Sequence, residues 1–137
     1  MFLEKFFIED DSGIHFTRKQ GSTFAKQIAG DFNPIHDEDS KRFCVPGDLL
    51  FSLVLHKYGI SEQMCFTFSG MVDEGKQLLL PEPMEQLTIS DTAGKEYLSI
   101  QRNGEVNNDQ ALIDQLIQRY VAFSGQAFPH ILVPLME

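Results

Sequence analysis

The sequence predicts an α+β domain in which an antiparallel sheet packs against a buried helix. Short segments of alternating apolar and polar residues, separated by Gly, Asn and Asp, are typical of antiparallel strands joined by turns. Residues 49–58 are apolar on nearly every face, which indicates a helix that is buried all round. With 137 residues, 42% of them hydrophobic, the chain is large enough to form one domain with its own core.

The first part of the chain is predicted to contain two strands and a helix. Residues 2–8 are rich in aromatic side chains, which favour a strand, and residues 10–16 form a turn and a short return strand. Thr17 and Gln20 have the spacing of a capping box, so a helix begins there. We expect this helix to end at Gly30, because glycine readily adopts the left-handed conformation found at helix C-termini.

The buried helix over residues 49–58 has recognisable ends. Asp48 is a good candidate for its N-cap, and Gly59 closes it. Beyond Gly59, the alternation and the turn residues predict strands over 64–69, 78–80, 86–90 and 96–101, with turns at 91–94 and 103–104.

The C-terminal part of the chain differs from the sheet-forming pattern. An amphipathic helix capped by Asn108 or Asp109 is followed by an apolar tail from Ala127 to Met136. The apolar stripe of this helix comprises Leu112, Ile113, Leu116, Ile117, Tyr120 and Val121. Because chain termini are usually polar, we expect the tail to pack against another chain or a missing second repeat. We therefore divide the chain into residues 1–107 and residues 108–137.

The charge and the cysteine content of the sequence restrict the classes of function that it can have. A net charge of −9 argues against a nucleic-acid surface, and an anionic ligand would need a local basic patch, for which Lys41, Arg42 and Lys57 are candidates. No stretch approaches the roughly 20 apolar residues that cross a bilayer, and the N-terminus is too short and acidic for a signal peptide. Cys44 and Cys65 lie far apart, as is typical of reduced thiols in a cytosolic protein, so we expect a cytoplasmic location.

The most informative segment is Gly30-Asp31-Phe32-Asn33-Pro34-Ile35-His36. Proline disfavours the α-helical region for the residue before it, so the chain must bend at Asn33, just after the end of the first helix. This bend can bring Asp31 and His36 to the same wall of a cleft. A carboxylate beside a histidine forms a usable acid–base pair at neutral pH, because histidine titrates there and the carboxylate can orient it.

This segment resembles the signature of the MaoC-like, (R)-specific enoyl-CoA hydratase family, Gly-Asp-x-Asn-Pro-aliphatic-His. More narrowly, the chain resembles the amino-terminal half of a bacterial family of unknown function that carries the same motif. The resemblance implies a hotdog fold over residues 1–107, in which a curved antiparallel sheet wraps a long central helix, with an extra C-terminal helix. It also implies a homodimer that acts, without a cofactor, on a 2-enoyl or 3-hydroxyacyl thioester of coenzyme A or acyl carrier protein.

The resemblance also implies roles for individual residues. In that family the pair equivalent to Asp31 and His36 binds and deprotonates a water, so these two are the predicted catalytic residues. Backbone N–H groups at the start of the central helix hold the thioester oxygen, which places Gly47 in the substrate site. Asn33, which shapes the turn, and Ser52, on the central helix, are the other predicted substrate-binding residues. No metal ligand is predicted.

The chain departs from the family pattern at Pro46, which removes a backbone donor, and at Arg42, where the family has a small residue. Two alternatives therefore stay open. One is a non-catalytic hotdog module that binds an acyl thioester or a partner protein, in which the motif is only a turn. The other is a hotdog thioesterase, whose hydrolysis would depend on Asp48.

Overall fold

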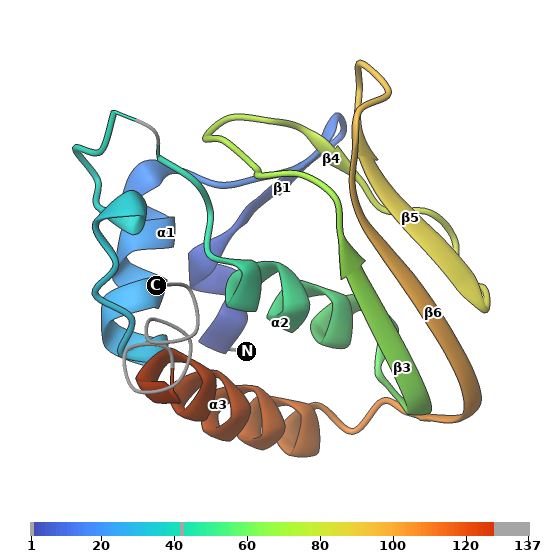
Figure 1. Ribbon diagram of the computed structural model, residues 1–137. Coiled ribbons are helices and arrows are strands. Elements are labelled where there is room, and N and C mark those ends of the chain that lie inside the picture. The colour runs from blue at the N-terminus through green and yellow to red at the C-terminus, as the bar shows by residue number, and fades with distance from the viewer. Residues whose placement is uncertain (1, 42, 128–137) are drawn as a thin grey trace.

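A computed structural model describes residues 2–41 and 43–127, with side chains described as far as residue 122. The fold is α+β, with one six-stranded antiparallel sheet beside a group of helices (Figure 1). The elements in chain order are η1 (Phe2–Phe6), β1 (Ile8–Asp10), β2 (Gly13–His15), α1 (Arg18–Thr23), η2 (Phe24–Ala29), η3 (Pro34–His36), α2 (Gly47–Tyr58), β3 (Ile60–Phe68), β4 (Leu78–Leu79), β5 (Gln86–Asp91), β6 (Glu96–Asn107) and α3 (Gln110–Ala127).

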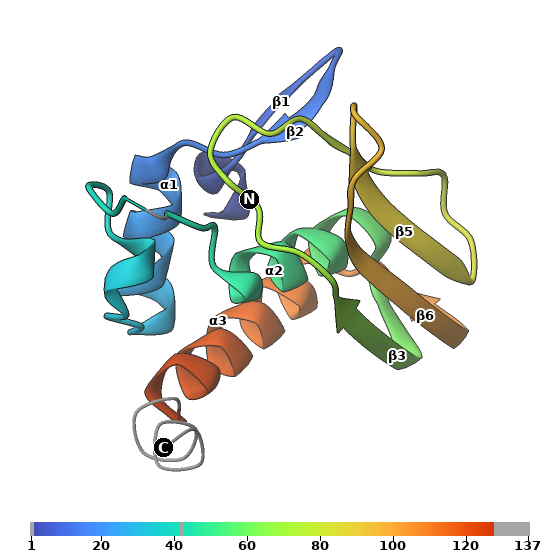
Figure 2. The ribbon, with the colours of Figure 1, turned by 45° about the horizontal axis from the view of Figure 1, so that its top comes forward.

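The sheet has the strand order β1-β2-β4-β5-β6-β3, and each neighbouring pair is antiparallel. β3 and β6 form the longest pairing, from Ile60 opposite Asn107 to Phe68 opposite Leu98. β5 and β6 form the hairpin predicted around residues 91–94. Figure 2 shows β5, β6 and β3 side by side, with β3 as the last strand at this end of the sheet.

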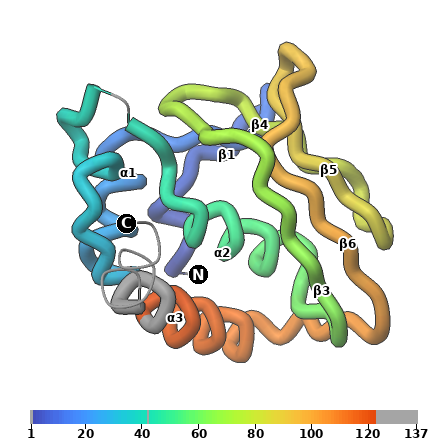
Figure 3. Tube along the Cα trace, in the orientation of Figure 1, coloured from blue at the N-terminus to red at the C-terminus, as the bar shows by residue number. Residues whose placement is uncertain are grey.

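α2 lies in the middle of the molecule, between the sheet and the helices α1 and α3 (Figures 1 and 2). Its buried residues come from every side of the helix, as the apolar pattern predicts: Leu49, Leu50, Ser52, Leu53, Val54, Leu55 and Tyr58. α3 runs past α2 (Figure 3) and contacts both α2 and η2. Its residues Ile113, Ile117 and Val121 are completely buried. In the part of the chain that the structure describes, no helix combines the length and the apolar character that crossing a bilayer requires.

The prediction of a long central helix was wrong. α2 has only 12 residues, which is about 18 Å of helix. The predicted N-cap was wrong as well, because the N–H groups of Leu49 and Leu50 donate to the carbonyl of Pro46, which makes Pro46 the N-cap. Asp48 therefore lies within the first turn of α2.

Two further local predictions were wrong. Residues 2–6 form a 3₁₀ helix instead of a strand, because a helical turn places Leu3 and Phe6 together in the core. The expected turn at 103–104 lies inside β6, where Gly104 has a φ of 87°. The register between β3 and β6 shifts there, so the chain forms a bulge and continues the strand. The apolar tail beyond Ala127 and the predicted patch residue Arg42 lie outside the described residues.

Candidate functional site

The turn between η2 and η3 carries the motif residues. Gly30 ends η2 in the left-handed conformation, with a φ of 66°. The side-chain oxygen of Asn33 accepts a hydrogen bond from the N–H of Ile35 at 3.1 Å, so Asn33 shapes the turn ahead of η3. The chain reverses direction within these residues and brings Asp31 and His36 together.

Asp31 and His36 face each other, with 3.5 Å between Oδ2 of Asp31 and Nε2 of His36. Their side chains are 19% and 12% exposed, respectively. Oδ1 of Asp31 accepts from the N–H of Asn33 at 3.0 Å, which fixes the carboxylate. Nδ1 of His36 lies 2.9 Å from the carbonyl oxygen of Cys44. Because a carbonyl oxygen only accepts, Nδ1 carries the hydrogen, and Nε2 of the neutral ring is the basic nitrogen that faces Asp31.

Cys44 belongs to this group of side chains, although no sequence pattern predicts that position for it. Its Sγ lies 3.8 Å from Nδ1 of His36, so a cysteine, a histidine and an aspartate lie together. Burial, and then the carboxylates of Asp31 and Asp73, raise the pKa of the Cys44 thiol. The thiol therefore stays protonated at neutral pH, which disfavours a thiolate nucleophile and favours acid–base chemistry by the Asp31–His36 pair.

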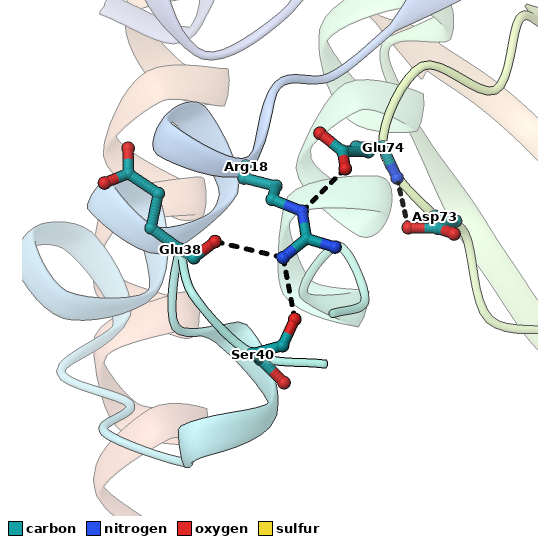
Figure 4. Close-up of polar contacts among 5 residues, drawn as sticks. All are labelled: Arg18, Glu38, Ser40, Asp73 and Glu74. Carbon is teal, nitrogen blue, oxygen red and sulfur yellow. Dashed lines mark hydrogen bonds and ion pairs between the residues drawn. The ribbon is translucent and has the colours of Figure 1, made fainter. Parts of the chain in front are cut away.

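Arg18 anchors the loop that follows the motif (Figure 4). Its Nη1 donates to the carbonyl oxygens of Glu38, at 3.1 Å, and Ser40, at 2.7 Å. Its Nε donates to the carboxylate of Glu74 at 2.6 Å. The guanidinium group thus ties the start of α1 to the loop after His36 and to the segment before β4, which restrains the surroundings of the acid–base pair.

Gly47 begins α2 and is exposed. Its N–H is one of the first groups of the helix, which have no acceptor within the helix itself. Gly47 opens on a cavity of about 390 Å³ that is lined by Gly47, Asp48, Phe51, Phe66, Phe68 and Tyr120. Asp31 and His36 do not line this cavity. The carbonyl of Cys44, on which His36 is anchored, lies shortly before Gly47 along the chain.

Ser52 and Lys57 have other partners. Ser52 is fully buried, and its hydroxyl donates to the carbonyl of Asp48 at 2.7 Å, a bond within the helix. Ser52 does not line the cavity beside Gly47, so its role with substrate stays a prediction. Nζ of Lys57 lies 2.7 Å from a carboxylate oxygen of Glu9, which neutralises this candidate for an anion-binding patch.

The fold and the site define an α+β domain that presents a partly buried Asp–His pair on a turn between two helices. Among the described residues, no group of three or more His, Cys, Asp and Glu side chains is placed to hold a metal ion. A family model described as "Protein of unknown function (DUF3581)" matches residues 1–137, and the chain belongs to this family. No curated protein and no solved structure matches it.

Proposed function

We propose that the protein is a hydratase or dehydratase acting on a 2-enoyl or 3-hydroxyacyl thioester, with coenzyme A or acyl carrier protein as the carrier. The observation that carries this proposal is the 3.5 Å separation between Oδ2 of Asp31 and Nε2 of His36. A water at this point could donate one hydrogen to the carboxylate and the other to the basic nitrogen. The match of the motif to the MaoC-like signature supports the same chemistry.

The proposed reaction adds the elements of water across the double bond. Nε2 of His36 takes a proton from the water as its oxygen bonds to the β-carbon, and Asp31 stabilises the imidazolium that forms. The pair then returns a proton to the α-carbon. Negative charge builds on the thioester oxygen during attack, and the N–H of Gly47 at the positive end of α2 is the proposed donor to that oxygen.

We further propose that the sheet and α2 form a compact version of the hotdog fold, and that two copies associate. An antiparallel sheet beside a buried helix supports this fold assignment. The 12 residues of α2 make it shorter than the helix that the resemblance implies, and α3 is an additional element.

The test is hydration of crotonyl-CoA, followed by the loss of enoyl absorbance. We expect Asp31→Asn and His36→Ala to lower the rate by ~10²–10⁴-fold, as is usual when an acid–base group is removed. Asp39→Asn is the matched control, because Asp39 is an exposed carboxylate in the loop after the motif. Equal, background-level rates in the wild type and all three variants would contradict hydration of this substrate.

A non-catalytic module that binds an acyl thioester is the second candidate. The hydrogen bonds of Asp31 and Asn33 to nearby N–H groups favour it, because they show that the motif also builds a turn. The Asp31→Asn variant distinguishes the enzyme from the non-catalytic module, because the amide oxygen of the new side chain can still accept from the N–H of Asn33. Loss of turnover with an unchanged melting temperature indicates catalysis. Binding of crotonyl-CoA without turnover by the wild type indicates the module.

A further inference from the structure

We propose that a groove between η1 and the helices α1 and η2 binds a small organic phosphate. The groove has a volume of about 290 Å³. Its lining includes Lys5, Phe6, Thr17, Lys19, Thr23 and Gln27. The positions in α1 and η2 are spaced along one side of these consecutive helices, and η1 forms the opposite wall.

The groove is positively charged in a chain that is acidic overall. The sequence has 20 Asp and Glu residues against 11 Lys and Arg residues, yet no carboxylate lines this groove. Within residues 2–41 and 43–122, neither Lys5 nor Lys19 has a carboxylate partner, and the ammonium group of Lys5 lies 5.3 Å from the ring centroid of Phe6. The carboxylate of Glu4 lies close enough to His56 to raise the pKa of that histidine, and it does not line the groove.

The charged groups of the groove, Lys5 and Lys19, favour an anionic ligand. Each lysine ammonium group offers three donors, and the hydroxyl of Thr23 and the side-chain amide of Gln27 can donate as well. Two ammonium groups suit a dianion, and lysine is a frequent phosphate-binding residue. A phosphate group is therefore the anion that this combination fits best.

The two walls of the groove are already joined. The side chain of Gln20 accepts from the N–H of Thr17 at 3.0 Å and donates to the carbonyl of Lys5 at 3.3 Å. η1 and α1 are thereby held together before any ligand arrives, which lowers the entropic cost of binding. Two lysines in a small groove cannot offset the repulsion between a chain of net charge −9 and a nucleic-acid backbone, so a small molecule is the favoured ligand.

This inference does not rest on the proposed hydratase chemistry, because the groove and the Asp31–His36 pair have no residue in common. Isothermal titration calorimetry with adenosine 3′,5′-bisphosphate and with inorganic phosphate tests it directly. We expect the double variant Lys5→Gln/Lys19→Gln to bind the bisphosphate ~10-fold or more weakly than the wild type. The control is Lys76→Gln/Lys95→Gln, which removes the same charge from exposed lysines outside the groove.

Both lysines of the groove are exposed, so the double variant should keep the melting temperature of the wild type. Retained affinity in the control, together with weakened binding in the groove variant, would support the proposal. An equal loss in the two double variants would overturn it, because the attraction would then follow net charge alone. Failure of the wild type to bind the bisphosphate would overturn it as well, and binding of inorganic phosphate with equal affinity would rule out an organic ligand.

Discussion

His56, near the end of α2, shows how burial sets the charge of a single side chain. Its pKa is lowered from the usual value, first because burial removes the imidazolium from water and then because Lys57 adds a positive charge. Glu4, Asp114 and Gln110 act in the opposite direction. The folded chain therefore favours the neutral imidazole, whereas the unfolded chain takes up a proton near pH 6.5.

We expect the unfolding free energy to decrease as the pH falls below 6.5, because the unfolded chain then binds more protons at His56 than the folded chain does. The His56→Leu variant should show a weaker decrease. Leucine does not titrate, and it keeps an apolar contact with Phe7, whose ring centroid lies 5.8 Å from that of His56. Urea unfolding at about pH 7.5 and about pH 5.5 measures the difference. The same loss of stability in both proteins would show that another group is responsible.

The prediction of individual site residues was limited by sequence separation. Asp31 and His36 could be singled out because they lie in one short motif whose proline forces a bend. The contact of His36 with Cys44 spans 8 residues and has no sequence signal of its own. The bond between Arg18 and Glu74 spans 56 residues, so only the folded chain could show it.

At the scale of elements, the passage from α2 into β3 depends on Gly59. Its φ is 82°, and its N–H donates to the carbonyl of Leu55 at 2.9 Å, which closes the helix. A Cβ at this position would contact the side-chain oxygen of Asn108 and would lie 2.9 Å from the carbonyl oxygen of Asn107. Position 59, where the end of α2 approaches the junction between β6 and α3, therefore accepts only a residue without a side chain.

We expect Gly59→Ala to destabilise the protein by more than the ~1–2 kcal/mol that a left-handed backbone costs other residues, because the new methyl group also meets backbone atoms. Gly94→Ala is the matched control. Gly94 has a φ of 91°, but a Cβ there would have no atom within 4 Å. Chemical denaturation of both variants measures the two losses. Equal losses would mean that the steric contact at Gly59 relaxes without consequence.

Elements with a local signal could be predicted, and those selected by tertiary contacts could not. The capping box is present, with the N–H of Gln20 donating to Oγ1 of Thr17 at 3.0 Å, and the hairpin around residues 91–94 forms where its turn residues place it. Residues 2–6 have an aromatic composition that favours a strand. Their helical turn forms because it buries side chains such as Phe6, and this gain depends on the rest of the core.

At the scale of the whole molecule, the sheet leaves a long edge open in the part of the chain that the structure describes. β3 has nine residues and pairs only with β6. Beside this edge, the ring centroid of Phe51 lies 4.9 Å from that of Phe66 in β3 and 4.8 Å from that of Tyr120 in α3. Phe51 thereby connects the β3 edge to the surface of α3. Leu112 and Leu116 continue this apolar surface. An open edge beside exposed apolar side chains favours association.

We therefore expect sedimentation velocity at micromolar concentration to show a dimer. The double variant Leu112→Lys/Leu116→Glu should sediment as a monomer with little change in melting temperature, because these side chains are 44% and 38% exposed. Met84→Lys, which places a charge on an exposed apolar residue before β5, should remain a dimer. A monomeric wild type would contradict association, and a double variant that stays dimeric would exclude α3 from the contact. In that case the β3 edge, with its unpaired backbone groups, would have to carry the interface alone.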